Sequence, residues 1–275
     1  MTYDEIRCEI AERVATITLA RPARRNAWTR RMGQEFRDAL AAADARADVR
    51  AIVVTGEGKD FCVGADLEGG GKVFADAAAA QAAGEARRPL RAWQIRKPII
   101  GALNGTAAGV GATLPLQWDL RLAGESTRLG FVFVRRGLVP EAGSTWILPR
   151  LVGMSRAAEL LLTGRMLSAT EALAWGLVSR VVPDADLLGV AQEMAAEIAT
   201  AAAPHAVALT KQLLWRSAGM PDPVAAEELE ARVFAWAKAQ PEAREGLRAF
   251  AEKRPPAWAD DAGLPDLDAL ADEEP

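Results

Sequence analysis

The stretch KPIIGALNGTAAGVGATL (residues 97–114) joins a short apolar strand, a glycine-rich turn and the start of a helix. Small residues fill the turn, so a ligand can approach the main chain closely there. The helix is expected to begin near Val110, which places the N–H of Val110 at the positive end of the helix dipole. This stretch therefore predicts a strand, a tight turn and a helix that presents a backbone donor.

A similar unit lies earlier in the chain. The β-branched run RAIVVTG (50–56) predicts a buried strand, and FCVGADL (61–67) follows it with small residues that leave the N–H near Ala65 free. Two such donors that converge on one oxygen form an oxyanion hole. The alternative is that both passages are ordinary strand-to-helix turns, and the spacing alone favours that alternative.

The flanking sequence continues the alternation of strands and helices. RCEI (7–10) and RVATITLA (13–20) predict a hairpin with a turn near Glu12. Helical spacing follows in residues 28–45 and in the alanine-rich stretch 74–96, and the later runs DLRLAG (119–124) and LVSRVVP (177–183) predict two more strands. The expected fold class is therefore α/β with a largely parallel sheet.

The pattern changes near residue 185. Residues 1–185 form the expected α/β core, and residues 186–254 show helical patterns that break at Pro204, at GMPDP (219–223) and at Pro241. Residues 255–275 are rich in Pro, Ala, Asp and Glu and are expected to form a loose acidic tail.

Composition excludes several functions. The net charge is −4 and there is no long basic run, so neither nucleic acid nor an anionic membrane surface is an expected partner. No apolar stretch is long enough to span a bilayer. The start of the chain does not resemble a signal peptide and the two cysteines, Cys8 and Cys62, lie far apart, so a cytoplasmic location is expected.

The chain contains a single histidine, His205, within a helical pattern. A Ser-His-Asp triad or a multi-histidine metal site would have to be built around it, so no metal site is predicted and His205 is expected to serve on a helix surface or as a cap. Two glycine-rich passages also fail as phosphate motifs. GGGKV (69–73) lacks the remaining P-loop residues, and GVGATL (109–114) has a leucine where a dinucleotide fingerprint needs its third glycine.

Four passages occur in the order and spacing of the crotonase superfamily, the enoyl-CoA hydratases and isomerases. They are FCVGADL, NGTAAGVGA, GLVPEAGSTWILPRLVG and TGRMLSATEALAWGLVSRVVP, within a resemblance that runs from about Tyr3 to Trp258. The resemblance implies a spiral of ββα units with a helical C-terminal trimerisation region, an acyl-CoA thioester substrate, no separate cofactor, and trimers often paired into hexamers. It also implies that the N–H groups of Ala65 and Val110 hold the thioester oxygen.

Departures from the family pattern narrow the reaction. Hydratases of this family carry two glutamates at positions that hold Thr113 and Phe133 here, so the two-glutamate addition of water lacks its proton-transfer groups. The family's isomerases use a single acidic residue after the proline of GLVP, where this chain has Glu141. The resemblance therefore favours an isomerase that moves a double bond from the 3- to the 2-position, with Glu141 as acid and base.

Three alternatives remain beside that interpretation. One is hydratase activity, as the family's usual name suggests, and another is a dehalogenase, although Ala86 and Phe133 stand where that branch has its histidine base and its halide-binding tryptophan. The third is a protein that binds acyl-CoA without turnover.

Glu141 itself has two interpretations. Val139, Phe133 and Trp146 are expected to desolvate its carboxylate and raise its pKa. The competing interpretation is that Glu141 caps the helix that follows it.

The resemblance also points to residues that bind the substrate. RPARRNAW (21–28) is similar to the segment that wraps coenzyme A, and FAEKRPPAW (250–258) is similar to the end of the last helix, where Lys253 has a solvated helix end as its alternative role. The implied substrate-binding residues are Arg25, Ala27, Val63, Asp66, Leu67, Thr113, Phe133, Phe250 and Lys253.

Overall fold

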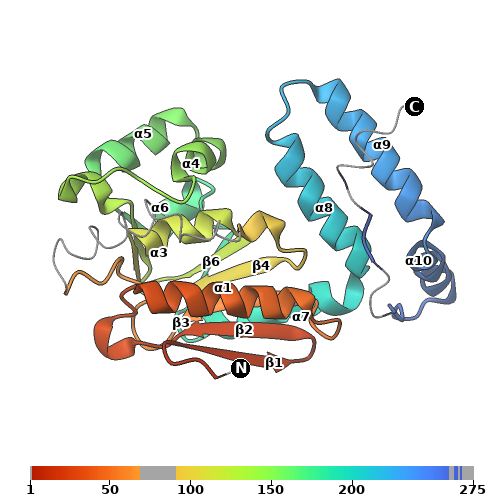
Figure 1. Cartoon of the computed structure of the whole chain (residues 1–275), viewed down its shortest axis with the longest axis horizontal. Coiled ribbons are helices and arrows are strands. Elements are labelled where there is room, and N and C mark those ends of the chain that lie inside the picture. Colours follow the sequence, from red (N-terminus) through yellow and green to blue (C-terminus); the bar gives the residue numbers. More distant parts are fainter. Residues whose placement is uncertain (1, 69–90, 260–262, 266, 268–275) are drawn as a thin grey trace, which may run out of the picture.

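The computed structural model describes residues 2–68, 91–259, 263–265 and 267 (Figure 1). The strands are β1 (Ile6–Ala11), β2 (Val14–Leu19), β3 (Ala51–Gly56), β4 (Ile99–Leu103), β5 (Thr106–Ala108), β6 (Leu120–Gly124), β7 (Arg128–Gly130), β8 (Met166–Ser168) and β9 (Arg180–Val182). The helices are α1 (Arg30–Ala45), α3 (Val110–Thr113), α4 (Ser144–Val152), α5 (Met154–Thr163), α6 (Ala169–Ala174), α7 (Leu187–Ala201), α8 (Pro204–Ser217), α9 (Pro223–Ala239) and α10 (Pro241–Glu252). Short 3₁₀ turns are η1 (Pro22–Arg24), η2 (Ala92–Gln94), η3 (Leu114–Gln117) and η4 (Val132–Arg136).

The main sheet has the strand order β1-β2-β3-β4-β6-β9. β1 and β2 form the predicted antiparallel hairpin, and the remaining neighbours are parallel. Glu12 and Arg13 form its turn with positive φ angles of 48° and 66°. A smaller sheet, β5-β7-β8, stands beside the main one. The prediction of an α/β fold with a largely parallel sheet is confirmed.

The main sheet is covered on both faces, which explains why its central strands are continuous apolar runs. Along β3, Ile52 and Val54 pack into the cluster that also contains residues of α1, whereas Ala51 and Val53 pack into a second cluster with α7. Successive strand residues point to opposite faces, so one β-branched run serves both clusters.

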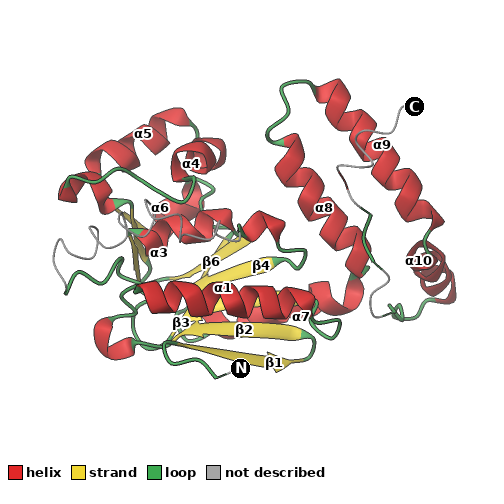
Figure 2. Cartoon of the chain, viewed as in Figure 1, coloured by secondary structure: helices red, strands yellow, loops and turns green. Residues whose placement is uncertain are grey.

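The helix α7 lies in the predicted C-terminal helical region, yet it packs on the sheet through Leu187, Ala191, Ala195 and Ala199. The predicted boundary at residue 185 thus falls before a helix that covers one face of the core. The helices α8, α9 and α10 stand apart from the sheet and form the helical part predicted from the sequence (Figure 2). Each of the three begins with a proline at its first position, where the missing N–H needs no partner.

Two expectations about the C-terminal part are corrected. The described part of the acidic tail is not loose: the indole N–H of Trp258 donates to the carbonyl of Thr200 (3.1 Å), and Leu267 is buried against α8 and α9. His205 is not on a helix surface, because its ring is buried at the start of α8, 3.4 Å from the carboxylate of Glu242 and edge-on to Trp236. Tertiary contacts of these residues, which the local sequence pattern does not show, account for both differences.

The predicted helix at 74–96 falls mostly on residues 69–90, outside the described residues, and η2 is the part that is described. Within the described ranges, no helix combines the length and apolarity needed to cross a bilayer.

Candidate active site

The two glycine-rich turns run side by side in register. A parallel bridge pairs Cys62 with Ala107, in which the N–H of Cys62 donates to the carbonyl of Thr106 (3.1 Å) and the N–H of Ala108 donates to the carbonyl of Cys62 (2.9 Å). Ala65 and Val110 each lie three residues beyond this bridge. The pairing therefore brings the two predicted donors to equivalent places on adjacent segments.

The orientation of Ala65 is fixed by a bridge on its other side. Trp28 donates its N–H to the carbonyl of Gly64 (2.8 Å) and accepts from the N–H of Asp66 (2.9 Å) through its own carbonyl. Backbone groups of successive residues in an extended segment point to opposite edges, so the N–H of Ala65 points away from Trp28. It faces the edge along which residues 107–110 run.

Glycines allow these turns to approach each other. Gly64 and Gly109 have φ angles of 106° and 55°, and a Cβ on Gly109 would lie 3.4 Å from the Cα of Gly64. Val110 is the first residue of α3, and the first N–H groups of a helix have no acceptor within it. Among the described residues, no acceptor meets the N–H of Ala65 or Val110. Both donors are thus available to an oxygen placed between them.

Glu141 is held by the same short helix. The hydroxyl of Thr113 donates to Oε1 of Glu141 (2.5 Å), and Thr113 is fully buried one helical turn beyond Val110. Gln117 fixes the loop by donating from Nε2 to the carbonyl of Ala142 (2.8 Å). A helical turn rises about 5 Å, so α3 brings the carboxylate close to one of the oxyanion donors.

Burial raises the pKa of Glu141, while the Thr113 hydroxyl and the positive charge of Arg91 act in the opposite direction. Glu141 is exposed over the residue as a whole, but its carboxylate meets a fully buried hydroxyl, so the acidic group lies at the buried end of the side chain. The predicted increase in pKa is confirmed, but its predicted cause is partly wrong. Val139 is 81% exposed, so it is a poor cover for the carboxylate, whereas Trp146 stacks on Trp215.

The capping interpretation of Glu141 is wrong. The N-cap of α4 is Gly143, and no side chain caps this helix. Glu141 contributes only its main-chain carbonyl, which accepts from the N–H of Ser144 (3.0 Å). Ala142 and Gly143 adopt left-handed conformations, with φ of 57° and 74°, and lead the chain into α4. The Glu141 side chain does not cap this helix and instead accepts from Thr113.

The predicted coenzyme A segment lies next to the Ala65 turn. Arg25 pairs with Asp60 (2.8 Å) and accepts through its carbonyl from the N–H of Val63 (3.3 Å). The carbonyl of Ala27 accepts from the guanidinium of Arg21 (2.5 Å), and Arg21 also pairs with Asp66 (2.9 Å). Leu67, two residues beyond Ala65, is an exposed apolar side chain. Arg25, Val63 and Leu67 remain predicted contacts with substrate, whereas Asp66 and the Ala27 carbonyl are engaged within the chain.

The remaining predicted site residues lie on other elements. Phe133 is half-buried in η4, four residues before the αL turn at Gly137 that leads toward Glu141. Phe250 is in the last turn of α10 and Lys253 is its C-cap, and α10 lies on the opposite side of the molecule from α3 (Figure 1). Phe250 is 86% exposed. One chain therefore does not bring these two residues to its own candidate site.

Sequence reasoning missed the residues that support the site, namely Arg21, Asn26, Asp60 and Arg91. Asn26 is fully buried with a φ of 54° and donates from Nδ2 to the carbonyls of Glu57 (2.9 Å) and Asp60 (2.7 Å). Asparagine tolerates left-handed backbone better than most residues do, so the residue type at position 26 was the one local indication of a turn.

Among the described residues, neither the Cys62 thiol nor a metal cluster adds a reactive group to the site. Burial raises the pKa of the Cys62 thiol to about 11, so it stays protonated and is a poor nucleophile. The described part of the chain contains no group of three or more His, Cys, Asp and Glu side chains arranged to hold a metal. Among the described residues, the candidate chemical groups at this place are the Glu141 carboxylate and the N–H groups of Ala65 and Val110.

The chain is similar to known proteins over most of its length. A family model described as enoyl-CoA hydratase/isomerase matches residues 9–261. The enoyl-CoA hydratase ACTT3 of Alternaria alternata is 40% identical over 252 residues, 91% of this chain and 84% of that protein. The 1,2-epoxyphenylacetyl-CoA isomerase of Escherichia coli is 36% identical over 248 residues, 88% of this chain and 94% of that protein.

Solved structures give the same result. An enoyl-CoA hydratase from Bacillus anthracis matches with a TM-score of 0.85 at 34% identity, covering 94% of this chain and 100% of that one. Hydratase names predominate among the similar proteins, with an isomerase among them. The predicted crotonase fold is confirmed, and the chain belongs to the enoyl-CoA hydratase/isomerase family of acyl-CoA enzymes.

Proposed function

We propose that this enzyme moves the double bond of an enoyl-CoA from the 3- to the 2-position. The observation that carries the proposal is the hydrogen bond between Thr113 and Glu141, which sets a single carboxylate of raised pKa beside the Val110 N–H. A base of raised pKa can take a proton and return it within one turnover.

The reaction divides into two proton transfers. Glu141 removes a proton from C2, and the electron pair of the C2–H bond moves into a dienolate whose negative oxygen lies between the N–H groups of Ala65 and Val110. The protonated Glu141 then delivers the same proton to C4, and the double bond settles between C2 and C3. Each oxyanion donor is expected to contribute about 3 kcal/mol to the stability of the dienolate.

Hydration is the second candidate, because hydratase is the name that most relatives carry. Water addition needs one group to activate water and a proton donor for the neighbouring carbon. The positions that the family resemblance assigns to these glutamates hold Thr113 and Phe133, and Thr113 is already donating to Glu141. The residues present therefore support isomerisation better than hydration.

The test compares Glu141→Gln with the wild type. Isomerisation of a 3-enoyl-CoA, followed through the absorbance of the conjugated 2-enoyl thioester, should fall by roughly 100- to 10,000-fold, while acyl-CoA affinity changes little. Glu125→Gln, which alters an exposed glutamate after β6, is the matched control and should keep wild-type turnover.

Two results would contradict the proposal. Near wild-type turnover by the Gln variant would show that another group moves the proton. Tight acyl-CoA binding without conversion of any 2- or 3-enoyl-CoA in a broad panel would identify the wild type as a binding protein.

A further inference from the structure

We propose that Arg21 is a positioning residue that aims the N–H of Ala65 at the thioester oxygen, acting through Asp66 and the Ala27 carbonyl. The inference rests on the proposed enolate chemistry. It assigns a role in that chemistry to the ion pair between Arg21 and Asp66, two residues that are 45 positions apart in sequence. The pair lies on the side of Ala65 that faces away from the expected substrate.

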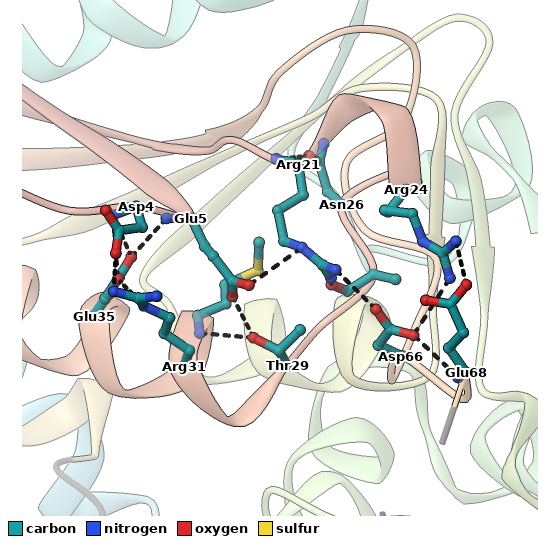
Figure 3. A network of polar contacts seen from close by, with 12 residues as sticks. Asp4, Glu5, Arg21, Arg24, Asn26, Thr29, Arg31, Glu35, Asp66 and Glu68 are labelled. Carbon is teal, nitrogen blue, oxygen red and sulfur yellow. Dashed lines mark hydrogen bonds and ion pairs between the residues drawn. The ribbon is translucent and has the colours of Figure 1, made fainter. Parts of the chain in front are cut away.

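The guanidinium of Arg21 makes contacts in three directions. Nη2 donates to Oδ2 of Asp66 (2.9 Å), Nη1 donates to the carbonyl of Ala27 (2.5 Å), and Nε lies 3.4 Å from the carboxylate of Glu5. Figure 3 shows Arg21 between Glu5 and Asp66, with contacts to both. Its side chain is only 19% exposed, so these contacts are largely shielded from water. A planar guanidinium can hold several acceptors in fixed directions at once, which an ammonium cannot.

These contacts converge on the two segments that orient Ala65. Asp66 follows Ala65 directly, and Ala27 precedes Trp28, whose backbone holds both neighbours of Ala65. Arg21 therefore ties the segment that carries the donor to the segment that sets its direction. A rotation of the Gly64–Ala65 peptide would have to break a Trp28 hydrogen bond or pull Asp66 away from Arg21.

The other end of the network is anchored in regular structure. Glu5 accepts from the hydroxyl of Thr29, and Thr29 caps α1 by accepting from the N–H of Met32 (2.9 Å). Glu35 on α1 in turn accepts from the N–H of Glu5 (2.8 Å) (Figure 3). The position of Arg21 is thus set by β1 and α1, which makes it a rigid support.

The negative charge of Asp66 is part of the contacts that hold Ala65 in place. Its pKa is held below the usual range by the N–H of Glu68 and the guanidinium of Arg21, so it is ionised throughout the neutral range. An ionised carboxylate beside the oxyanion hole would oppose the negative charge of an enolate. Its pairing with Arg21 both fixes its place and offsets that repulsion.

Arg21→Met tests the inference with a probe that needs no turnover. Acetoacetyl-CoA is a 3-oxoacyl thioester whose enolate absorbs in the near ultraviolet, so a pH titration gives the apparent pKa of the bound ligand. Arg21→Met should raise that pKa by about one unit and lower the kcat for 3-enoyl-CoA by roughly 10- to 100-fold, less than complete loss of a donor would. Affinity for free coenzyme A, which has no thioester oxygen, should change by less than about twofold.

The matched control is Arg165→Met. Arg165 pairs with two carboxylates, Glu159 (2.6 Å) and Glu171 (3.0 Å), and its side chain is 28% exposed. It lies outside the two turns, so its variant should keep both the ligand pKa and kcat. Arg21→Lys is the second test variant for the case that Arg21→Met does not fold, because it keeps the positive charge but cannot hold several acceptors in fixed directions, and a smaller shift in the same direction is expected.

The outcomes separate this inference from the proposed function. An enolate band of wild-type pKa in Arg21→Met, or in Arg21→Lys if that is the folded variant, overturns the inference alone. A parallel loss of kcat, coenzyme A affinity and melting temperature also overturns it, since that pattern indicates only structural support. Absence of any enolate band in the wild type overturns the proposed function and this inference with it.

Discussion

The carboxylate of Asp60 lies buried beneath the guanidinium of Arg25 and also accepts from the N–H of Thr106 (3.0 Å). The Arg25 hydrogen bond is the largest cause that lowers the pKa of Asp60 from 3.8 to about 2. A depressed pKa means that the charged form favours the folded state. This stabilisation is complete above pH about 4 and is lost as the pH falls toward 2.

Asp60→Asn should therefore lower the free energy of unfolding at pH 7 by about 1–2 kcal/mol, a value reduced for the exposure of Arg25. The difference from wild type should shrink as the pH falls below 4, which urea denaturation at a series of pH values can measure. Asp48→Asn is the control, because the Arg46–Asp48 pair is exposed on both sides. A pH-independent difference would contradict the assigned cause.

Residues differ in how far the sequence could predict them. Glu141 was predictable because it stands in a specific motif, and the increase in its pKa was predicted from desolvation of its carboxylate. Arg21 and Asp66 are 45 residues apart, and no local pattern indicates which of several nearby arginines meets which carboxylate. Glu141 was also given the wrong covering residues, since adjacency in sequence placed Val139 beside it while the chain turns Val139 outward.

At the scale of elements, α3 is a short helix whose start matters more than its length. Gly109→Pro should reduce isomerisation more than about 100-fold, because proline cannot adopt the φ of 55° and its ring removes the N–H that donates to Gly130 (2.9 Å). Val110→Ala keeps the N–H and should retain activity within about threefold, with about 1–2 kcal/mol of stability lost from packing. Initial rates and thermal melts of both variants measure this.

Equal loss of activity in both folded variants would show that the Val110 side chain matters, not its N–H. A melting curve for Gly109→Pro that matches the wild type would confirm that its loss is local.

Most of the elements predicted correctly have long runs, although the three-residue strand β9 was also predicted, within the apolar run 177–183. β2, β3 and β4 carry five or six residues with a clear apolar pattern, and α1 has full helical spacing. The sheet β5-β7-β8 was not predicted, because each of its strands has three residues and pairs with partners distant in sequence. Periodicity needs several residues to be visible, and these strands are too short to show it.

At the scale of the whole molecule, the helical C-terminal part exposes large apolar side chains. Phe234 on α9 is 70% exposed, and a groove of about 620 Å³ lies between α8 and α9 beside it. Val233, the residue before Phe234, is instead buried within the chain. Other exposed apolar residues of this part are Leu214, Val224, Leu247 and Phe250. Contiguous apolar surface of this kind usually marks an interface.

This surface indicates self-association, and the family resemblance implies the subunit number, so we predict a trimer or hexamer at micromolar concentration, as light scattering can measure. Phe234→Glu should shift it toward monomer, since a charge would have to be buried without a partner. Glu197→Gln on the exposed side of α7 is the control. A monomeric wild type would refute the prediction. In a monomer, Phe250 and Lys253 would lie away from the candidate site and could not contact coenzyme A bound there.

Positions 113 and 141 share one small volume, because the Thr113 hydroxyl reaches the Glu141 carboxylate. A glutamate at 113 would place a second carboxylate there, and two carboxylates in contact cannot both ionise, so they would share one proton. The residue at 113 thus decides whether Glu141 works as a lone base or as half of an acid pair. We therefore expect that Thr113→Glu alone would weaken Glu141 as a base without supplying the second group that hydration of an enoyl-CoA needs.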